Sequence, residues 1–354
     1  MRLITKFYAL CTLGLCGILS SAWLLASDHY YRRVVSPNFT WESDSQSPPS
    51  YDRRLVVFGD SWSDNAAAIP GSVWTNQLCS EISCELDNLA QTAKSIRGNY
   101  IGSVVDNAEL SSARTLFGLY RSPVADFKHQ VKKWLDDESA ALLNSSEEEI
   151  QSRQNSTIFV VSFGVWDIWD LVGQDYNKAM ASVDRSIDVL MGQLDVLSEG
   201  WNTNDFKVIL TLTPDVTFLP AFKSTAKKHP NQQKDTVKIV QYWNDKLRAA
   251  AGQWKFGTIH LFDMNEFMVG LIRDRQLIAV GAEEEPTGKE DPRWENVNEP
   301  CVTTRRQWVT TSEQECENPE KYLFWNDMHL GSSAHRLMGQ EVFHEIEEKW
   351  FSTE

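Results

Sequence analysis

Short apolar runs alternate along this chain with longer segments whose apolar residues recur at helical spacing. The runs are rich in β-branched and aromatic residues and predict buried parallel strands at residues 55–58, 157–163, 207–213 and 258–262. The periodic segments predict amphipathic helices at residues 72–82, 124–143, 179–197, 235–254 and 332–350. Because strands that alternate with helices form a parallel sheet covered on both faces, we expect an α/β fold.

Residues 1–27 predict entry into the secretory pathway, because a short basic start precedes an uncharged, mostly apolar run at residues 7–27. The run is long enough to span a bilayer, and Leu25 stands where signal peptidase prefers a small residue. We therefore favour a single-pass, type II signal anchor over a cleaved signal peptide. Residues 28–50 are polar and typical of a stalk, so we expect the folded domain at residues 51–354, on the lumenal or extracellular side.

The cysteines and glycosylation sequons agree with a secretory route. Four cysteines outside the apolar run fall into two local pairs, so we favour the disulfides Cys79–Cys84 and Cys301–Cys316 among three connectivities. Their spacing is wrong for a structural zinc site, and we expect no metal. Residues 283–315 are charged and loop-rich and predict an insertion closed by the second disulfide. Sequons for N-glycosylation lie at Asn38, Asn144 and Asn155.

Composition excludes some classes of protein. With 42% apolar and 23% charged residues, the chain is neither disordered nor a polytopic membrane protein. Its formal net charge of −15 argues against a nucleic-acid partner, because a phosphate backbone needs a basic protein face. The 14 tryptophans suit sugar stacking and core packing equally well.

The first predicted strand ends abruptly at Gly59-Asp60-Ser61. Ser61 should therefore lie just beyond the carboxyl end of a parallel strand, where ligands collect in open α/β sheets. A serine there can be a nucleophile if a base reaches its hydroxyl, or it can simply cap a helix. We expect Asp60 and Asp64 to fix the turn around Ser61 rather than act as catalytic acids, and Asn65 to support the same loop.

His329 is the histidine best placed to act as the base. It lies between a short apolar run and the last predicted helix, which puts it at the same carboxyl edge of the sheet. The other six histidines lie in the stalk, on helices, in polar loops or inside a predicted strand. The alternative for His329 is a helix-capping or hydrogen-bonded structural role.

These segments together resemble the GDSL, or SGNH, serine esterase/lipase superfamily over most of residues 51–350. Residues 58–65, Phe-Gly-Asp-Ser-Trp-Ser-Asp-Asn, resemble its nucleophile block, and residues 71–78 resemble the helix that follows. Residues 316–329, which end in Asn-Asp-Met-His, resemble its histidine block with the preceding cysteine. The resemblance implies a flavodoxin-like three-layer α/β/α sandwich with a mainly parallel sheet. It also implies hydrolysis of esters without a cofactor, often of acetyl groups on carbohydrate in the fungal-type extracellular members.

Two departures from the family concern the oxyanion hole, which the family builds from a glycine block, an asparagine block and the serine's own N–H. Residues 88–94 occupy the glycine block, and Ala93 replaces the glycine. A backbone donor survives that change if the conformation does. Trp166 replaces the asparagine of the second block, and its indole N–H is a donor with a different reach and direction.

The third departure concerns the acid, since the family's aspartate three residues before the histidine is here Asn326. An asparagine can orient an imidazole, but it supplies no charge and can hold the wrong tautomer. Three interpretations are open. Asp327 takes the role through a shifted loop, Ser61 and His329 act as a dyad, or the domain is a weak or dead esterase.

The sequence thus predicts a monomeric serine hydrolase of carboxylic esters, with O-acetyl esters of a glycan as the favoured substrates, Ser61 as nucleophile and His329 as base. The rival is an SGNH-fold glycan-binding or accessory protein without activity. A hydrogen bond between Ser61 and His329 beside an open cleft favours the enzyme. A bulky Trp166 side chain lying over Ser61 favours the rival.

Overall fold

The computed structural model describes residues 52–65, 69–94, 100–109, 124–226, 230–281, 294–306 and 311–351. All of these fall in the unit Tyr51–Glu354. The predicted signal anchor at residues 1–27 and stalk at residues 28–50 lie outside the described residues, as does Asn38. Within the described part of the chain, no helix is both long enough and apolar enough to cross a membrane.

A five-stranded sheet forms the centre of the unit, and every neighbouring pair of its strands is parallel. Its order is β2-β1-β5-β6-β7. Numbered along the sheet alone this is 2-1-3-4-5, the flavodoxin-like order, in which the direction of winding reverses between the first and third strands. The strands are β1 (Arg54–Gly59), β2 (Glu85–Asn88), β5 (Thr157–Ser162), β6 (Lys207–Leu212) and β7 (Thr258–Asp263). The predicted α/β fold is confirmed.

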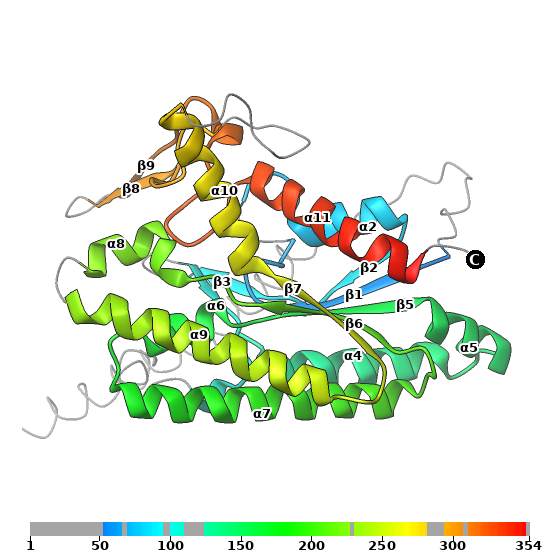
Figure 1. Cartoon of the computed structure of the whole chain (residues 1–354). Coiled ribbons are helices and arrows are strands. Elements are labelled where there is room, and N and C mark those ends of the chain that lie inside the picture. Colours follow the sequence, from blue (N-terminus) through cyan, green and yellow to red (C-terminus); the bar gives the residue numbers. More distant parts are fainter. Residues whose placement is uncertain are drawn as a thin grey trace, which may run out of the picture. The chain divides into compact units, whose positions relative to one another are not determined.

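Helices cover both faces of this sheet, which gives three layers (Figure 1). One layer holds α4 (Phe127–Leu142), α7 (Tyr176–Trp201) and α9 (Pro230–Gln253). The other holds α2 (Trp74–Ile82), α10 (Met264–Ala279) and α11 (Ser332–Trp350). The buried residues of α7 recur every three or four positions, so its apolar stripe faces the sheet as the periodicity predicts.

Several elements of the structure were not predicted from the sequence. Strand β2 is an edge strand of mainly polar residues, with partly exposed side chains. Helix α5 (Glu147–Ser156) has no buried residue and begins instead with a capping box at Ser146 and Glu149. The others are α6 (Val165–Leu171), α8 (Pro220–Ala226), α10, the three-residue helices η1 (Asn107–Glu109), η3 (Val216–Phe218) and η4 (Pro319–Lys321), and two hairpins.

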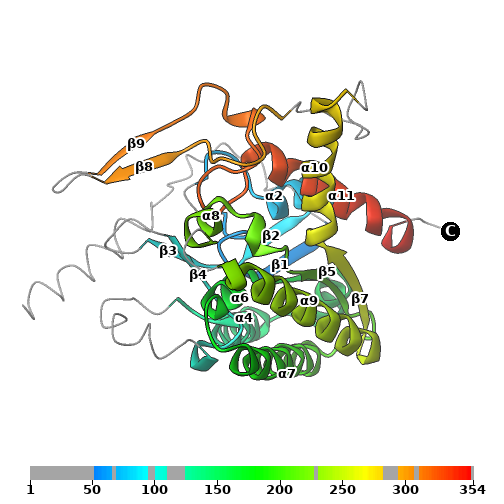
Figure 2. The same ribbon diagram turned by 60° about the vertical axis from the view of Figure 1, so that its left-hand side comes forward.

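The two hairpins are β3 (Thr92–Lys94) with β4 (Tyr100–Gly102), and β8 (Thr303–Arg306) with β9 (Thr311–Gln314). The second belongs to the predicted insertion and extends to one side of the sheet in Figure 2. Both predicted disulfides are confirmed, Cys79–Cys84 and Cys301–Cys316. The second one closes the base of the β8–β9 hairpin, which the sequence did not predict.

Candidate active site

Ser61 lies in the turn that follows β1, at the carboxyl edge of the sheet. The turn is held by Asp60, whose N–H donates to the Ser162 carbonyl at 3.2 Å and whose carboxylate accepts from the Trp62 N–H at 2.9 Å. Strands β1 and β5 are neighbours there, and they flank the point where the strand order reverses. Ser61 therefore occupies the position where doubly wound sheets bind their ligands.

His329 comes to Ser61 from the loop between η4 and α11, 268 residues further along the chain. Its Nε2 lies 2.7 Å from Ser61 Oγ. Two hydrogen bonds hold this loop, because the Trp325 N–H donates to the His329 carbonyl and the indole N–H of Trp62 donates to the Met328 carbonyl, each at 2.9 Å. Trp62 thus ties the serine turn directly to the histidine loop.

Asn326 holds the other side of the imidazole, with its Oδ1 2.9 Å from His329 Nδ1. The same oxygen accepts the backbone N–H of Met328 at 2.9 Å and of His329 at 3.0 Å. An amide NH₂ could not accept these two donors, so the network requires the oxygen to face the ring. His329 then carries its proton on Nδ1 and presents the Nε2 lone pair to the Ser61 hydroxyl, which is the tautomer that a general base needs.

The imidazole is in its neutral form at ordinary pH. Burial of the ring, together with the nearby His335, lowers the pKa of His329 to about 3. The group that meets Nδ1 is the uncharged amide of Asn326, which supplies no negative charge to stabilise an imidazolium. The neutral imidazole of His329 can therefore take the proton of Ser61. With Asn326 beside it, His329 is a weaker base than a histidine supported by an aspartate.

Trp166 also bonds to Ser61, from the first turn of α6, and its ring centroid lies 6.5 Å from that of His329. Gly164 starts this helix in a backbone conformation with a φ of 121°, which carries the chain sharply out of β5. The indole N–H donates to Ser61 Oγ at 2.8 Å. The ring lies so close over Gly102 of β4 that a Cβ added there would come within 2.1 Å of the indole. Ser61 Oγ consequently accepts from Trp166 and donates to His329.

The three side chains are almost completely covered. Ser61 is 0% exposed, His329 1% and Trp166 4%. The expectation for the enzyme is met only in part, because Ser61 bonds to His329 but is fully buried rather than beside an open cleft. The feature expected of the rival is present, because the bulky indole of Trp166 lies against the same hydroxyl. In this conformation an ester can reach Ser61 Oγ only if a covering side chain moves.

Comparison with known proteins identifies the relatives of this chain. No protein-family model matches the sequence. GDSL esterase/lipase 5 of Arabidopsis thaliana is 22% identical over 246 residues, which cover 67% of this chain and 62% of that protein. The chain is homologous to a GDSL esterase/lipase.

Solved structures similar to this chain include a lipase/acylhydrolase from Enterococcus faecalis, with 14% identity and a TM-score of 0.37 over 85% of this chain and 99% of that one. The carbohydrate acetylesterase Est24 from Sinorhizobium meliloti has 11% identity and a TM-score of 0.37 over 83% and 98% of the two chains.

The remaining site residues predicted from the sequence differ in how far they are buried. Ala93 is half-buried in β3, opposite Ile101 of β4. Asp64 is buried, and its N–H donates to the Asp60 carbonyl at 3.2 Å, whereas Asn65 is exposed. Asp327 is exposed. The residue that accepts from His329 Nδ1 is Asn326. The two described sequon residues, Asn144 and Asn155, are both exposed.

Two buried polar residues near the site are not foreseen in the sequence. Asp167 accepts the N–H groups of Val105 and Gly164 at 2.9 and 3.2 Å, which fixes the start of α6, and burial raises the pKa of Asp167 to about 7. Gln130 of α4 bonds to the backbone of Gly59. The sequence alone does not distinguish these two buried residues from a solvent-exposed Asp or Gln on a helix. Among the described residues, no cluster of His, Cys, Asp and Glu could hold a metal ion.

Proposed function

We propose that this protein is a serine hydrolase of carboxylic esters, and that its substrates are O-acetyl esters of a carbohydrate. The observation that carries the proposal is the 2.7 Å contact between His329 Nε2 and Ser61 Oγ, with the imidazole tautomer set by Asn326. The homology to a GDSL esterase/lipase supports the reaction class. The carbohydrate acetylesterase named among the similar structures suggests the substrate class.

In the proposed reaction His329 Nε2 takes the hydroxyl proton of Ser61 as Oγ attacks the acyl carbon. The carbonyl oxygen becomes an oxyanion, which the backbone N–H groups of Ser61 and Ala93 and the indole N–H of Trp166 would stabilise. His329 then gives its proton to the leaving alcohol, which leaves an acyl-serine. Water, deprotonated by the same imidazole, releases the acid and restores Ser61.

Trp166 suits a small acyl group in this scheme. Its indole already donates to Ser61 Oγ, so the same N–H is within reach of an oxygen on the carbon that Oγ attacks. The ring also fills the space beside the serine, and it is held against Gly102. A pocket bounded in this way would favour acetyl over longer acyl chains.

The second candidate is an accessory or glycan-binding protein that keeps the fold without turnover. The observation that favours it is the complete burial of Ser61, whose Oγ contacts both the Trp166 indole and the His329 imidazole. The neutral amide of Asn326 where the family has an acid points the same way.

Hydrolysis of p-nitrophenyl esters by residues 28–354 decides between the two candidates. Acetyl, butyryl and longer esters are compared for wild type and Ser61→Ala, with folding matched by circular dichroism. Turnover that disappears in Ser61→Ala and declines with acyl length supports the proposal. Equal rates in the two proteins, on these esters and on acetylated polysaccharides, support the accessory protein.

We also propose that the protein works in the secretory pathway, as a lumenal or extracellular domain on a type II anchor. The two disulfides support an oxidising compartment. Treatment with peptide-N-glycosidase provides the test, since glycans at Asn144 and Asn155 would make the protein from its native cell migrate faster after digestion. An unchanged mass would argue against this route.

A further inference from the structure

A single glutamine side chain holds the end of the strand that carries the candidate nucleophile. Gln130 is 1% exposed and projects from the first turn of α4. Its Oε1 accepts the Gly59 N–H at 2.9 Å, and its Nε2 donates to the Gly59 carbonyl at 3.0 Å. Gly59 is the last residue of β1 and lies two positions before Ser61.

The amide of Gln130 supplies the acceptor that the segment beside the end of β1 does not provide for the Gly59 N–H. On the side away from β5, β1 is paired with β2, which ends at Asn88. After Asn88 the chain still runs beside β1, and the N–H groups of Leu89 and Gln91 donate to the carbonyls of Val57 and Gly59. The Gly59 N–H, however, donates to Gln130 and not to this segment. A primary amide has the donor and acceptor of a peptide group, so it can satisfy both backbone groups of Gly59.

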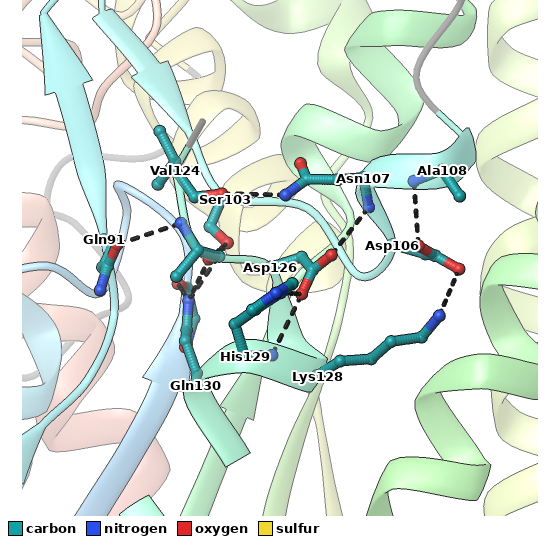
Figure 3. A network of polar contacts seen from close by, with 12 residues as sticks. Gln91, Ser103, Asp106, Asn107, Ala108, Val124, Asp126, Lys128, His129 and Gln130 are labelled. Carbon is teal, nitrogen blue, oxygen red and sulfur yellow. Dashed lines mark hydrogen bonds and ion pairs between the residues drawn. The ribbon is translucent and has the colours of Figure 1, made fainter. Parts of the chain in front are cut away.

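The same side chain reaches the support of Trp166. Gln130 Nε2 also lies 3.1 Å from Ser103 Oγ and 3.1 Å from the Ala125 carbonyl (Figure 3). Ser103 directly follows Gly102, on which the indole of Trp166 rests. One amide therefore joins the turn that carries Ser61 to the strand that supports the indole donating to Ser61.

Around Gln130 the hydrogen bonds form a continuous network (Figure 3). Gln91 accepts the Ala125 N–H at 3.1 Å, and its own carbonyl accepts the Ser103 N–H at 3.2 Å. Asp126 caps α4 by accepting the His129 N–H at 3.1 Å. These bonds hold the first turn of α4 against the loop, so the Gln130 side chain is pre-positioned rather than free to rotate.

From this geometry we infer that Gln130 is a positioning residue for the reaction: it sets the distance between the Ser61 hydroxyl and the Trp166 indole N–H. The inference rests on the proposed esterase function. Gln130 contacts neither Ser61 nor a substrate, so its loss would act on the alignment of the reacting groups. Misalignment lowers kcat more than it raises KM, because the substrate is still bound but is less often in a reactive geometry.

The test compares wild type, Ser61→Ala, Gln130→Met and Gln130→Glu on p-nitrophenyl acetate. Gln130→Met keeps the side-chain length and removes all its hydrogen bonds, so we expect kcat to fall by about tenfold to hundredfold with KM nearly unchanged. The rate at which an organophosphate such as paraoxon labels Ser61 should fall in parallel. Gln154→Met is the matched control, because its amide donates to the Trp201 carbonyl at the opposite edge of the sheet.

Gln130→Glu tests the role by pH. When protonated, the introduced carboxyl group can donate to the Gly59 carbonyl and accept from its N–H, as the amide does. When ionised, it can only accept, and it repels that carbonyl. We expect the variant to approach wild-type kcat at low pH and to lose activity as pH rises, while folding followed by circular dichroism stays constant. This variant also serves if Gln130→Met does not fold.

The outcomes separate the two claims. Ser61-dependent turnover in wild type with kcat unchanged in both Gln130 variants overturns the positioning role alone. A wild type that shows neither turnover nor paraoxon labelling at Ser61 overturns the proposed function and, with it, this inference.

Discussion

At the scale of single residues, the oxygen of Asn326 accepts from three N–H groups at once, two of the backbone and one of the imidazole. The backbone donors prevent the amide from turning its NH₂ group to the ring. An asparagine in place of an acid therefore keeps the useful tautomer of His329 and loses only the charge. The expected defect is weak support of the imidazolium rather than a misdirected base.

Asn326→Asp should therefore increase turnover. The carboxylate would keep all three hydrogen bonds, raise the pKa of His329 and stabilise the imidazolium that forms as Ser61 attacks. Since the opposite change in a serine protease costs roughly 10⁴-fold, we expect at least about a tenfold gain in kcat. The measurement is kcat on p-nitrophenyl acetate against pH, with Asp327→Asn as the exposed, neighbouring control. A lower kcat in Asn326→Asp would show that the amide is already the better partner.

Trp166→Phe tests whether the indole donates a hydrogen bond to the oxyanion or only blocks access to Ser61. It removes the indole N–H and keeps an aromatic ring. If that N–H stabilises the oxyanion, kcat falls by roughly 10²-fold, the lower end of the cost of one such donor. If Trp166 only covers the serine, kcat stays constant or rises. Trp169→Phe, on the same helix and packed against Phe222, controls for the loss of an indole from α6.

At the scale of elements, the site depends on how closely the β3–β4 hairpin approaches α6. Gly102 has no side chain, which lets the indole of Trp166 lie directly on the strand backbone. The strand needs glycine here for space, because no Cβ fits beneath the ring. Hairpin and helix come from segments more than 60 residues apart, and their contact sets where the indole N–H points.

Gly102→Ala should move the indole away from Ser61. A Cβ placed 2.1 Å from the ring forces Trp166 to shift, which we expect to cost about 1–3 kcal/mol of stability. The variant should also lose acetylesterase activity relative to its acceptance of longer acyl chains. Urea unfolding and the acyl-length profile measure the two effects. Gly192→Ala on α7, where a Cβ meets nothing within 4 Å, should leave both unchanged or add a little stability. Equal stability of Gly102→Ala and wild type would contradict the packing.

At the scale of the whole molecule, the fold buries histidine and aspartate side chains whose effects on the pH dependence of stability are opposite in sign. Burial lowers the pKa of His335 to about 4 and that of His329 to about 3. Burial raises the pKa of Asp167 to about 7 and that of Asp60 well above its usual range. Between about pH 4 and 6.5 the unfolded chain binds protons at the histidines that the native protein does not, so these groups make stability fall as pH falls. Asp167 makes stability fall as pH rises toward 7, and the raised pKa of Asp60 acts in the same direction.

His335→Leu should flatten the acid side of this profile. His335 is 0% exposed, and within the described structure neither ring nitrogen has a hydrogen-bond partner. Removing it eliminates a contribution of up to about 1.4 kcal/mol per pH unit to the slope of unfolding free energy between about pH 4 and 6.5. Urea unfolding at several pH values measures the slope. The exposed His344 on the same helix supplies the control, His344→Leu. An unchanged slope in His335→Leu would mean that the ring is solvated or paired in solution.

Local pattern was enough to predict four strands of the central sheet and its main helices, because β1, β5, β6 and β7 are apolar runs and α7 and α11 carry buried stripes. It was also enough to pair the cysteines and to single out Ser61 and His329. Edge strand β2 and helix α5 were not foreseen, since their residues bury little and leave no periodic signal.

What only the tertiary structure decided are the directions of polar groups. The sequence names Asn326 and Trp166 as departures from a family. Which atom of Asn326 meets His329, and where the Trp166 N–H points, depends on backbone donors and on the space above Gly102. Gln130 is one polar residue on an amphipathic helix until the fold brings it to Gly59. The spacing of apolar residues along the chain predicts which face of an element is buried. Hydrogen bonds between distant segments depend on atomic positions that no local pattern encodes.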